Sequence, residues 1–324
     1  MNRKPKLLIT GIAGFIGFHL ARKLYGDYTV FGIDITDGSV ANINGDRLRE
    51  LPEEIEYLET DIRNYDALKT VIGKFKPDLV IHLAACTGIA KSAIDPKLYF
   101  DTNVQGFYNV LEASRINGVN KIIYASSSSV YNNNNPVFKE SEQVDQQLSF
   151  YGTTKRINEL TASNYAKQFN LQCIGLRFFT VYGSWVRKDM AGWKFMESVE
   201  KGNALTLYNG GKVSRDFTHV SDIVKSIELL SEKVLEGHMK SDTACFNIGY
   251  GNPVSVKDYL QEISKNLNKE AIFNVAPLPD NELSHTHADT SLLQDIITYK
   301  PATDLKSGIA EMASWFKTYY KNTK

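Results

Sequence analysis

The chain lacks three features that would place it in other protein classes: paired cysteines, a long apolar run and an excess of one charge. Its 324 residues include only Cys86, Cys173 and Cys245, with no Cys-x-x-Cys spacing. This pattern excludes a disulfide framework and favours a reducing, cytoplasmic location. No stretch approaches the ~20 apolar residues of a membrane span. The basic N-terminus also lacks the apolar run of a secretory signal, so no membrane partner is expected.

Charge of neither sign dominates, since 37 Lys and Arg residues balance 37 Asp and Glu residues. A balanced chain gives no global electrostatic reason to bind nucleic acid or an anionic membrane. Any anionic ligand must therefore be held by a local site. His285 and His287 are the closest pair among the six histidines, but two imidazoles without further ligands are a weak metal signal, and no metal is predicted.

The order of apolar runs and helical patterns predicts an α/β fold. The expected strands, several of them continuously apolar as in a parallel sheet, are Lys6–Thr10, Tyr28–Asp34, Ile55–Asp61, Asp78–Ala84, Lys121–Ser127, Gln172–Phe179 and Ala244–Tyr250. The helical patterns between the first six cover Phe15–Tyr25, Tyr65–Lys74, Leu98–Asn117 and Phe150–Phe169. This alternation favours a Rossmann-type, doubly wound parallel sheet.

After the sixth strand the alternation stops, which suggests a smaller C-terminal substrate-binding region. We expect residues 1–176 to form the Rossmann domain, with the chain returning to it at about 217–250. The substrate region would comprise residues 177–216 and 251–324. A chain longer than the ~250–300 residues of a single large core is consistent with this division.

Gly11, Gly14 and Gly17 lie between the first strand and the first helix in "TGIAGFIG". Glycines there allow a tight turn and let a pyrophosphate approach the positive N-terminus of the helix. The same glycines could also serve the turn alone. Asp34, at the end of the second strand, is placed to accept hydrogen bonds from an adenosine ribose. Asp37 adds negative charge and no Lys or Arg lies nearby, so NAD is favoured over NADP.

Two further positions have more than one interpretation. Asp61 and Ile62 close the third expected strand, where they could border an adenine, but Asp61 could equally cap the next helix. Tyr151 and Lys155 are four residues apart on a predicted helix and so share a face. Such a pair is common by chance, yet a lysine one turn away can lower the pKa of a tyrosine so that it acts as a base.

The serine run Ser126–Ser129 supplies the context for that pair. It follows a buried strand at its carboxyl end, the edge where doubly wound sheets bind ligands. A hydroxyl there can bridge a substrate oxygen and the tyrosine, which gives a proton a defined path. A serine-rich turn is the alternative, but four consecutive serines directly after the strand favour a site.

Together, the glycine loop, the serines and Tyr-x-x-x-Lys resemble the extended short-chain dehydrogenase/reductases that modify nucleotide sugars. The resemblance runs nearly end to end, through "NVQGFYNVLEA", "YGTTKRINEL", "GLRFFTVYG" and "RDFTHVSDIV". Within that branch, "ASSSSVY" and "LRFFTVYGSWVRKDMA" look most like UDP-glucuronate 4-epimerases. The resemblance implies an isomerase that converts UDP-glucuronate to UDP-galacturonate by hydride removal at carbon 4, a 4-keto intermediate and hydride return.

The resemblance also implies roles for individual residues. The catalytic set would be Tyr151 as base, Lys155 as its partner, and Ser127 and Ser129 as positioning hydroxyls. NAD would contact Gly11, Ala13, Gly14, Phe15, Ile16, Gly17, Asp34, Asp61, Ile62, Leu83, Ala84, Ala85, Asn103, Tyr151 and Lys155. The UDP-sugar would contact Ser127, Ser128, Ser129, Thr180, Arg187, Tyr208, Arg215 and Glu282. A homodimer through the helices at Leu98–Asn117 and Phe150–Phe169 is also implied.

Several alternatives remain open from the sequence. A UDP-glucose/UDP-galactose or N-acetylated 4-epimerase would have no use for the charge of Arg187, which could then be a solvated loop cation. A UDP-glucuronate decarboxylase shares the 4-keto intermediate. The related decarboxylases usually have Glu, and 4,6-dehydratases Asp-Glu, where this chain has serines. A non-enzymatic NAD-binding protein is disfavoured because Tyr151 and Lys155 are both present.

The chain departs from the family pattern at three places. Ala90, beside Lys91, stands where the uronate epimerases usually have arginine. Asn132 replaces a glycine after the serine turn, and Glu282 stands where Gly-Asp is usual, which lengthens a carboxylate expected to meet a ribose hydroxyl. For Arg215, the expected diphosphate ligand, a surface salt bridge to the next residue, Asp216, is the alternative.

Overall fold

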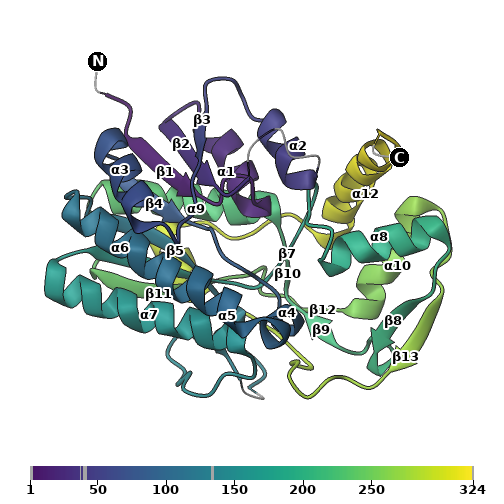
Figure 1. Ribbon diagram of the computed structural model, residues 1–324. Helices are drawn as coiled ribbons and strands as arrows, with labels where there is room; N and C mark the ends of the chain where they lie inside the picture. Colours follow the sequence, from purple (N-terminus) through teal and green to yellow (C-terminus); the bar gives the residue numbers. More distant parts are fainter. Residues whose placement is uncertain (1–2, 37, 39–41, 133–134, 323–324) are drawn as a thin grey trace.

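Seven parallel strands form the central sheet of the protein (Figure 1). The computed structural model describes residues 3–36, 38, 42–132 and 135–322, so the predicted charge at Asp37 lies outside the described residues. The strand order is β11-β6-β5-β4-β1-β2-β3. Their bounds are Lys6–Thr10 (β1), Thr29–Asp34 (β2), Glu56–Glu59 (β3), Leu79–His82 (β4), Lys121–Ser127 (β5), Gln172–Phe178 (β6) and Thr243–Ile248 (β11). This order confirms the Rossmann-type fold, whose crossover lies between β1 and β4.

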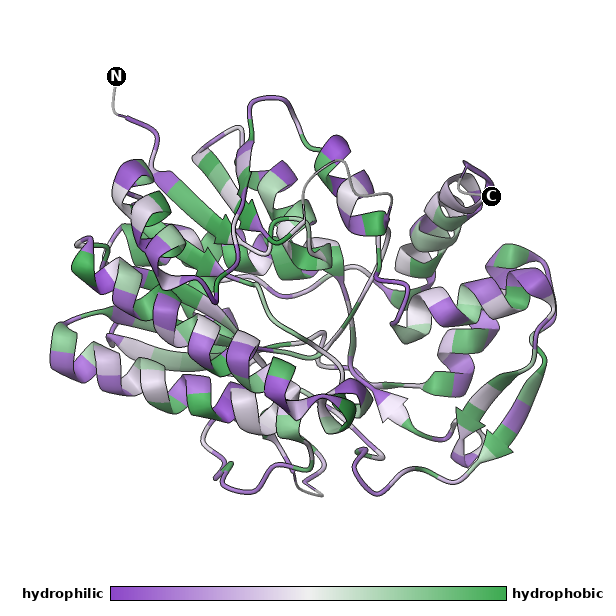
Figure 2. Cartoon of the chain, viewed as in Figure 1, coloured by the Kyte–Doolittle hydropathy of each residue, from purple (hydrophilic) through white to green (hydrophobic). Residues whose placement is uncertain are grey.

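Helices cover both faces of the sheet, as its alternating side chains require. In β1, Leu7 and Ile9 belong to one apolar cluster and Leu8 to another, because successive strand residues point to opposite faces. The Leu7 cluster packs against α1 (Phe15–Leu24) and α9 (Val220–Leu235). The Leu8 cluster packs against α3 (Tyr65–Phe75), α6 (Gly106–Ile116) and α7 (Phe150–Phe169). Figure 2 shows the resulting concentration of apolar residues in the sheet strands.

The prediction of a single helix over Leu98–Asn117 is wrong. The segment is divided into α5 (Pro96–Tyr99), a π-helical turn η1 (Phe100–Gln105) and α6. Such turns insert an extra residue into a helix and often occur at functional sites. Here the turn contains Asn103, which is buried and makes three hydrogen bonds to two residues on other segments, Cys86 and Thr154. Periodicity alone could not reveal this local change of pitch.

The chain leaves the main sheet at β7 (Thr180–Tyr182), which pairs with β10 (Phe217–His219) in a separate two-stranded sheet. The sequence predicts that the chain returns to the main sheet at about residues 217–250. Within that range the returning strand is β11, which pairs with β6, whereas residues 217–219 pair with β7. The region beyond β7 contains α8 (Ala191–Lys201), α10 (Val256–Leu267), α12 (Leu305–Asn322) and the pairs β8–β13 (Leu205–Tyr208, Phe273–Ala276) and β9–β12 (Ser214–Arg215, Val254–Ser255). In Figure 1 most of this region lies to one side of the main sheet.

The remaining elements are short and mostly join these layers. They are α2 (Ile43–Arg49), α4 (Ile89–Ile94), α11 (Ser291–Ile297) and the 3-10 turns η2 (Ser128–Val130) and η3 (Asn209–Gly211). Within the described ranges, no helix is both long enough and apolar enough to cross a membrane.

Candidate active site

The glycine loop between β1 and α1 is closed so tightly that side chains would not fit. Gly11 has φ +77°, and a Cβ there would lie 2.7 Å from the Ala84 nitrogen. A Cβ on Gly17 would lie 2.2 Å from the Gly11 carbonyl oxygen. Gly14 is the N-cap of α1, so no side chain caps the helix, and its first turn carries no acidic residue. The N-terminus of α1 therefore fits a pyrophosphate, as the motif predicts.

Asp34 closes one side of this loop. Its carboxylate accepts hydrogen bonds from the Ala13 nitrogen at 3.0 Å and from the Thr36 nitrogen at 3.2 Å. Burial raises the pKa of this carboxyl, and these backbone donors oppose the rise. The side chain is only partly buried, which leaves it able to accept from ribose hydroxyls. This hydrogen-bond acceptor therefore fits the adenosine ribose of NAD.

Asp61 is not the cap of the following helix. Asn64 caps α3 by accepting from the Ala67 nitrogen, whereas Asp61 pairs with Arg63 at 2.6 Å. That ion pair holds the pKa of Asp61 below its usual value. Ile62 is buried, and its carbonyl accepts from the Asn109 side chain at 3.0 Å. The N-cap alternative for Asp61 is thus excluded.

Two polar residues, Thr10 and Asn103, hold the loop after β4 in place. The Leu83 nitrogen donates to the Thr10 carbonyl at 3.1 Å, and the Ala84 nitrogen donates to the Thr10 hydroxyl at 3.2 Å. Asn103 accepts from the Cys86 nitrogen at 2.8 Å and donates to the Cys86 carbonyl at 2.9 Å. Asn103, which lies in the π-helical turn, therefore fixes the backbone next to Ala85. This segment lies beside the glycine loop.

Tyr151 and Lys155 lie on one face of α7, next to the end of β5. Ser149 caps this helix by accepting from the Gly152 nitrogen. The Lys155 side chain is 1% exposed, and its ammonium donates to the Ala125 carbonyl at 2.8 Å. It lies 5.9 Å from the centre of the Tyr151 ring. Ser127, the last residue of β5, hydrogen-bonds the Tyr151 side chain, so the structure brings the predicted catalytic residues together.

The electrostatics of this group differ from the expectation that Lys155 lowers the pKa of Tyr151. Burial raises the pKa of Tyr151, while the Ser127 hydrogen bond and the charge of Arg187 lower it. Burial also lowers the pKa of Lys155 to about 8. The cation that favours the phenolate in this structure is thus Arg187, which stands 36 residues further along the chain.

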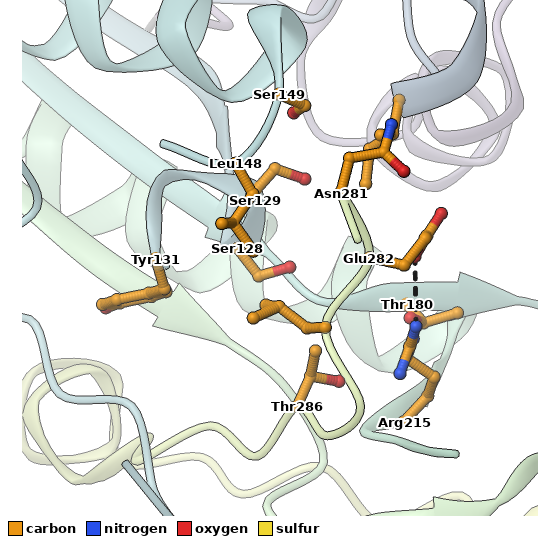
Figure 3. A pocket seen from close by; sticks show the side chains of 12 residues that line it. Ser128, Ser129, Tyr131, Leu148, Ser149, Thr180, Arg215, Asn281, Glu282 and Thr286 are labelled. Atoms are coloured by element: carbon orange, nitrogen blue, oxygen red, sulfur yellow. Dashed lines mark hydrogen bonds and ion pairs between the residues drawn. The ribbon is translucent and has the colours of Figure 1, made fainter. Parts of the chain in front are cut away.

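A cavity of about 130 Å³ opens beside the serine turn. Five predicted substrate ligands line it, namely Ser128, Ser129, Thr180, Arg215 and Glu282. Figure 3 shows them arranged around one hollow between the serine turn, β7 and the segment that carries Glu282. The predicted ligand Tyr208 is not part of this lining and is 42% exposed at the end of β8.

Arg215 pairs with Glu282 at 3.2 Å, drawn as a dashed line in Figure 3. Asp216, the alternative partner, is fully buried and accepts instead from the nitrogens of Tyr250, Gly251 and Ala288. Burial lowers the pKa of Arg215, and the charge of Glu282 opposes that effect. Arg215 thus forms a salt bridge, but with Glu282 and not with Asp216.

Arg187 lies within the loop that joins β7 to α8. Its Nε donates to Asp189 at 3.0 Å, and the same carboxylate accepts from Lys91 at 2.9 Å. Its side chain is 31% exposed and is not among the groups that line the cavity. Asp189 joins it to Lys91, and Ser92, the next residue, accepts from the Tyr151 nitrogen at 3.1 Å, so the charge of Arg187 lies on the side of the base.

Sequence reasoning missed two groups of residues at this site. The first group also lines the cavity and consists of Ile89, Tyr131, Leu148, Ser149, Asn281, Leu283 and Thr286. The second group is a buried network behind the serines: Ser126 donates to Glu159 at 2.6 Å, and Arg177 donates to both oxygens of that carboxylate. No local motif signals these contacts, because they join β5, β6 and α7.

The two neighbouring histidines have other partners. His285 bonds the Ser214 hydroxyl and the Pro136 carbonyl, and His287 bonds the Gly251 carbonyl. Over the parts of the chain that the structure describes, no three His, Cys, Asp or Glu side chains are grouped to hold a metal ion.

A glycine loop at the crossover of a parallel sheet, with a serine–tyrosine–lysine group beside it, defines a nucleotide-cofactor enzyme of the short-chain dehydrogenase/reductase class. The profile of the NAD dependent epimerase/dehydratase family matches residues 7–249, and the chain belongs to this family. It is an NAD-dependent UDP-sugar 4-epimerase and hence an isomerase.

Relatives of known name match almost the whole chain. Protein CapI of Staphylococcus aureus is 39% identical and the match covers 98% of this chain and 99% of that protein. UDP-glucuronate 4-epimerase 4 of Arabidopsis thaliana is 36% identical, over 100% of this chain and 78% of that protein. The crystal structure of UDP-glucuronic acid 4-epimerase from Bacillus cereus, with UDP-glucuronic acid and NAD, has a TM-score of 0.88 and 30% identity, covering 97% and 100% of the two chains.

Proposed function

We propose that the substrate is UDP-glucuronate and that the enzyme interconverts it with UDP-galacturonate. The observation that supports this choice is the position of Arg187, whose charge is close enough to Tyr151 to lower the pKa of the phenol. A cation beside the base lies near the reacting end of the sugar. As a contact to the substrate, its guanidinium has an ionic partner when that end carries a carboxylate and has none when it carries a hydroxymethyl group.

The catalytic steps of the chain itself are proton transfers. Tyr151 would accept the proton of the 4-hydroxyl and return it after the sugar has turned over, and Ser127 would hold the hydroxyl in line with it. Ser129 stands on the same turn, facing the cavity. Bound NAD supplies the acceptor and donor of the carbon 4 hydride. Lys155 would remain charged below about pH 8, and its ammonium donates to the Ala125 carbonyl at the end of β5.

The carboxylate of the substrate also has to be controlled. A 4-keto uronate is a β-keto acid and loses carbon dioxide when its carboxylate aligns with the keto group. Thr180, which lines the cavity, and Arg187 would hold the carboxylate out of that alignment. The serine turn, without an acidic residue, supports epimerisation over decarboxylation and dehydration.

The UDP would lie toward the C-terminal region. Arg215 in the cavity would meet the diphosphate, and Tyr208 would lie along the uridine. Glu282, which now pairs with Arg215, would have to release it or reach the ribose. We accordingly propose that residues 1–176 and about 217–250 bind NAD, and that residues 177–216 and 251–324 bind the nucleotide sugar.

We further propose that the protein is a homodimer. Leu98, Phe100, Tyr108, Leu160 and Phe169 are all between 39% and 55% exposed on α5, η1, α6 and α7. Exposed large apolar side chains on neighbouring helices are typical of an interface. Light scattering coupled to size-exclusion chromatography should give twice the 36.4 kDa chain mass. A monomer at micromolar concentration would refute the dimer.

Incubating the purified protein separately with UDP-glucuronate, UDP-glucose and UDP-N-acetylglucosamine, and following products by NMR, tests the substrate. We expect UDP-galacturonate from the first and little change in the other two. Conversion of UDP-glucose or UDP-N-acetylglucosamine without UDP-glucuronate would refute the uronate assignment. Release of a UDP-pentose would identify a decarboxylase, and tightly bound NAD with no turnover of any sugar would identify a non-enzymatic binder.

A further inference from the structure

Arg47 is a buried cation to which the proposed chemistry gives no role. It lies on α2 and is 0% exposed. One terminal nitrogen, Nη1, donates to the Ala13 carbonyl at 2.8 Å and to the Asn44 side chain at 2.7 Å. The other, Nη2, donates to the Trp185 carbonyl at 2.6 Å, and Nε reaches the same oxygen at 3.2 Å. One guanidinium thus bonds both the glycine loop and the loop that leads to Arg187.

The loop that Arg47 holds has an unusual backbone. Trp185 has φ +61°, a left-handed conformation that is uncommon for a large side chain. Such a conformation persists only where its surroundings fix it. The Trp185 ring packs against Phe18, Trp315 and Tyr319, and its carbonyl is held by Arg47. Arg187 follows two residues later, so the contacts that fix Trp185 also determine the position from which the chain continues to Arg187.

Ser184, the residue before Trp185, also bonds two other helices of the protein. The Ser184 carbonyl bonds the ring of His19 on α1 at 2.8 Å, and the Ser184 hydroxyl donates to Glu311 on α12 at 2.7 Å. The loop is therefore fixed between α1, α2 and α12. Of these contacts, those of Arg47 alone continue into the glycine loop within the described ranges.

The connection continues from Arg47 to the predicted ribose ligand. Ala13 accepts from Arg47 through its carbonyl and donates its own N–H to Asp34 at 3.0 Å. A continuous series of hydrogen bonds thus joins Asp34, Ala13, Arg47 and Trp185. A shift of the glycine loop would move the Ala13 carbonyl and change the geometry at the guanidinium, which is planar and binds in a fixed fork.

We propose that Arg47 is a positioning residue that couples binding at the glycine loop to the position of the loop carrying Arg187. By this coupling, occupation of either loop stabilises the geometry of the other. Such linkage is reciprocal: the UDP-sugar strengthens NAD binding by the factor by which NAD strengthens UDP-sugar binding. The proposal goes beyond the identity of the sugar, because it concerns the contact between two binding loops.

The test measures NAD affinity by titration calorimetry, with and without a UDP-sugar held at equilibrium with its 4-epimer so that no net reaction occurs. The variants are Arg47→Met, which removes the guanidinium, and Arg47→Lys, which keeps a charge but cannot reproduce the fork. Arg49→Met is the matched control, since Arg49 stands on the same helix with its side chain 47% exposed. Circular dichroism and thermal unfolding establish that each variant is folded.

For the wild type and for Arg49→Met, the UDP-sugar should tighten NAD binding by at least about fivefold, the lower end of typical coupling. In Arg47→Met the ratio should fall to within about twofold of one, and in Arg47→Lys it should at least be halved. An unreduced ratio in a folded Arg47→Met overturns the proposal. If Arg47→Met does not fold, an unreduced ratio in Arg47→Lys overturns it.

A wild-type ratio of one also overturns the coupling. Failure to convert UDP-glucuronate, by contrast, refutes the proposed function and leaves this test intact. The titration is then performed with the UDP-sugar that the enzyme does convert.

Discussion

The Asp189 carboxylate lies 3.0 Å from the Arg187 Nε and 2.9 Å from the Lys91 ammonium, so one anion is shared by two cations. Partial burial opposes its ionisation, but the two cations prevail and hold the pKa of Asp189 at about 2. The three groups therefore carry one net positive charge at neutral pH. A single substrate carboxylate would neutralise it, and Lys91 can retain Asp189 while Arg187 turns to the sugar.

Replacing Arg187 with methionine should selectively impair the uronate. We expect kcat/KM for UDP-glucuronate to fall roughly 10- to 150-fold, because a hydrogen bond to a charged group contributes about 1.5–3 kcal/mol. Bound NAD, measured after denaturation, should remain at the wild-type level. Lys188→Met is the control, since Lys188 lies over the rings of Trp193 and Tyr319. Unchanged turnover in Arg187→Met would make Arg187 a loop cation only.

Removal of the Tyr151 hydroxyl should abolish proton transfer without loss of the fold. We expect kcat of Tyr151→Phe to fall about 10²- to 10⁴-fold, the usual contribution of a positioned acid or base. Tyr165→Phe is a matched control on the same helix, because its hydroxyl bonds Glu112 on α6. A Tyr151→Phe enzyme with more than a tenth of wild-type kcat would move the base to another group.

Local spacing made the two halves of the catalytic centre predictable. Gly11, Gly14 and Gly17 are required by the turn itself, since a Cβ at any of them would lie 2.8 Å or less from backbone atoms. Tyr151 and Lys155 share a face because they are one helical turn apart. The contacts of Gly14 and Gly17 lie within one short segment, as does the pairing of Tyr151 with Lys155, so the sequence pattern and the geometry coincide there; Gly11 in addition packs against Ala84 of the loop after β4.

The residues that connect the segments could not be predicted in this way. Arg47 stands on a short helix and has no local motif, and its partners Ala13 and Trp185 are 34 and 138 residues away. The π-helical turn around Asn103 is likewise set by contacts with Cys86 and Thr154, not by periodicity. Long-range packing decides such positions, and a single sequence does not record it.

The buried ammonium of Lys155 predicts a pH dependence of stability. Burial lowers its pKa from 10.5 to about 8, so between these values the unfolded chain binds a proton that the folded protein does not. Stability should therefore rise with pH across that window, by about 2 kcal/mol between pH 8 and 9.5. Other groups titrate there too, so the comparison is with Lys155→Met.

Urea unfolding at pH 7.5 and pH 9.5 measures this difference. We expect the free energy of unfolding of the wild type, relative to Lys155→Met, to be higher at pH 9.5 than at pH 7.5. Lys121→Met is a suitable control, because the Lys121 ammonium also donates to a backbone carbonyl, that of Leu235, but its side chain is only partly buried. Parallel pH profiles for wild type and Lys155→Met would show that the folded Lys155 keeps its proton.

The Arg215–Glu282 pair predicts opposite effects of its two members on UDP binding. Arg215→Met should weaken UDP binding about tenfold or more, because it removes a charged donor from a cavity where the guanidinium is 17% exposed. Glu282→Gln should strengthen UDP binding, since it removes a carboxylate that competes with the diphosphate for Arg215. Titration calorimetry with UDP at two salt concentrations measures both. Weaker binding by Glu282→Gln would instead assign Glu282 to a ribose hydroxyl, the role its place in the sequence first suggests.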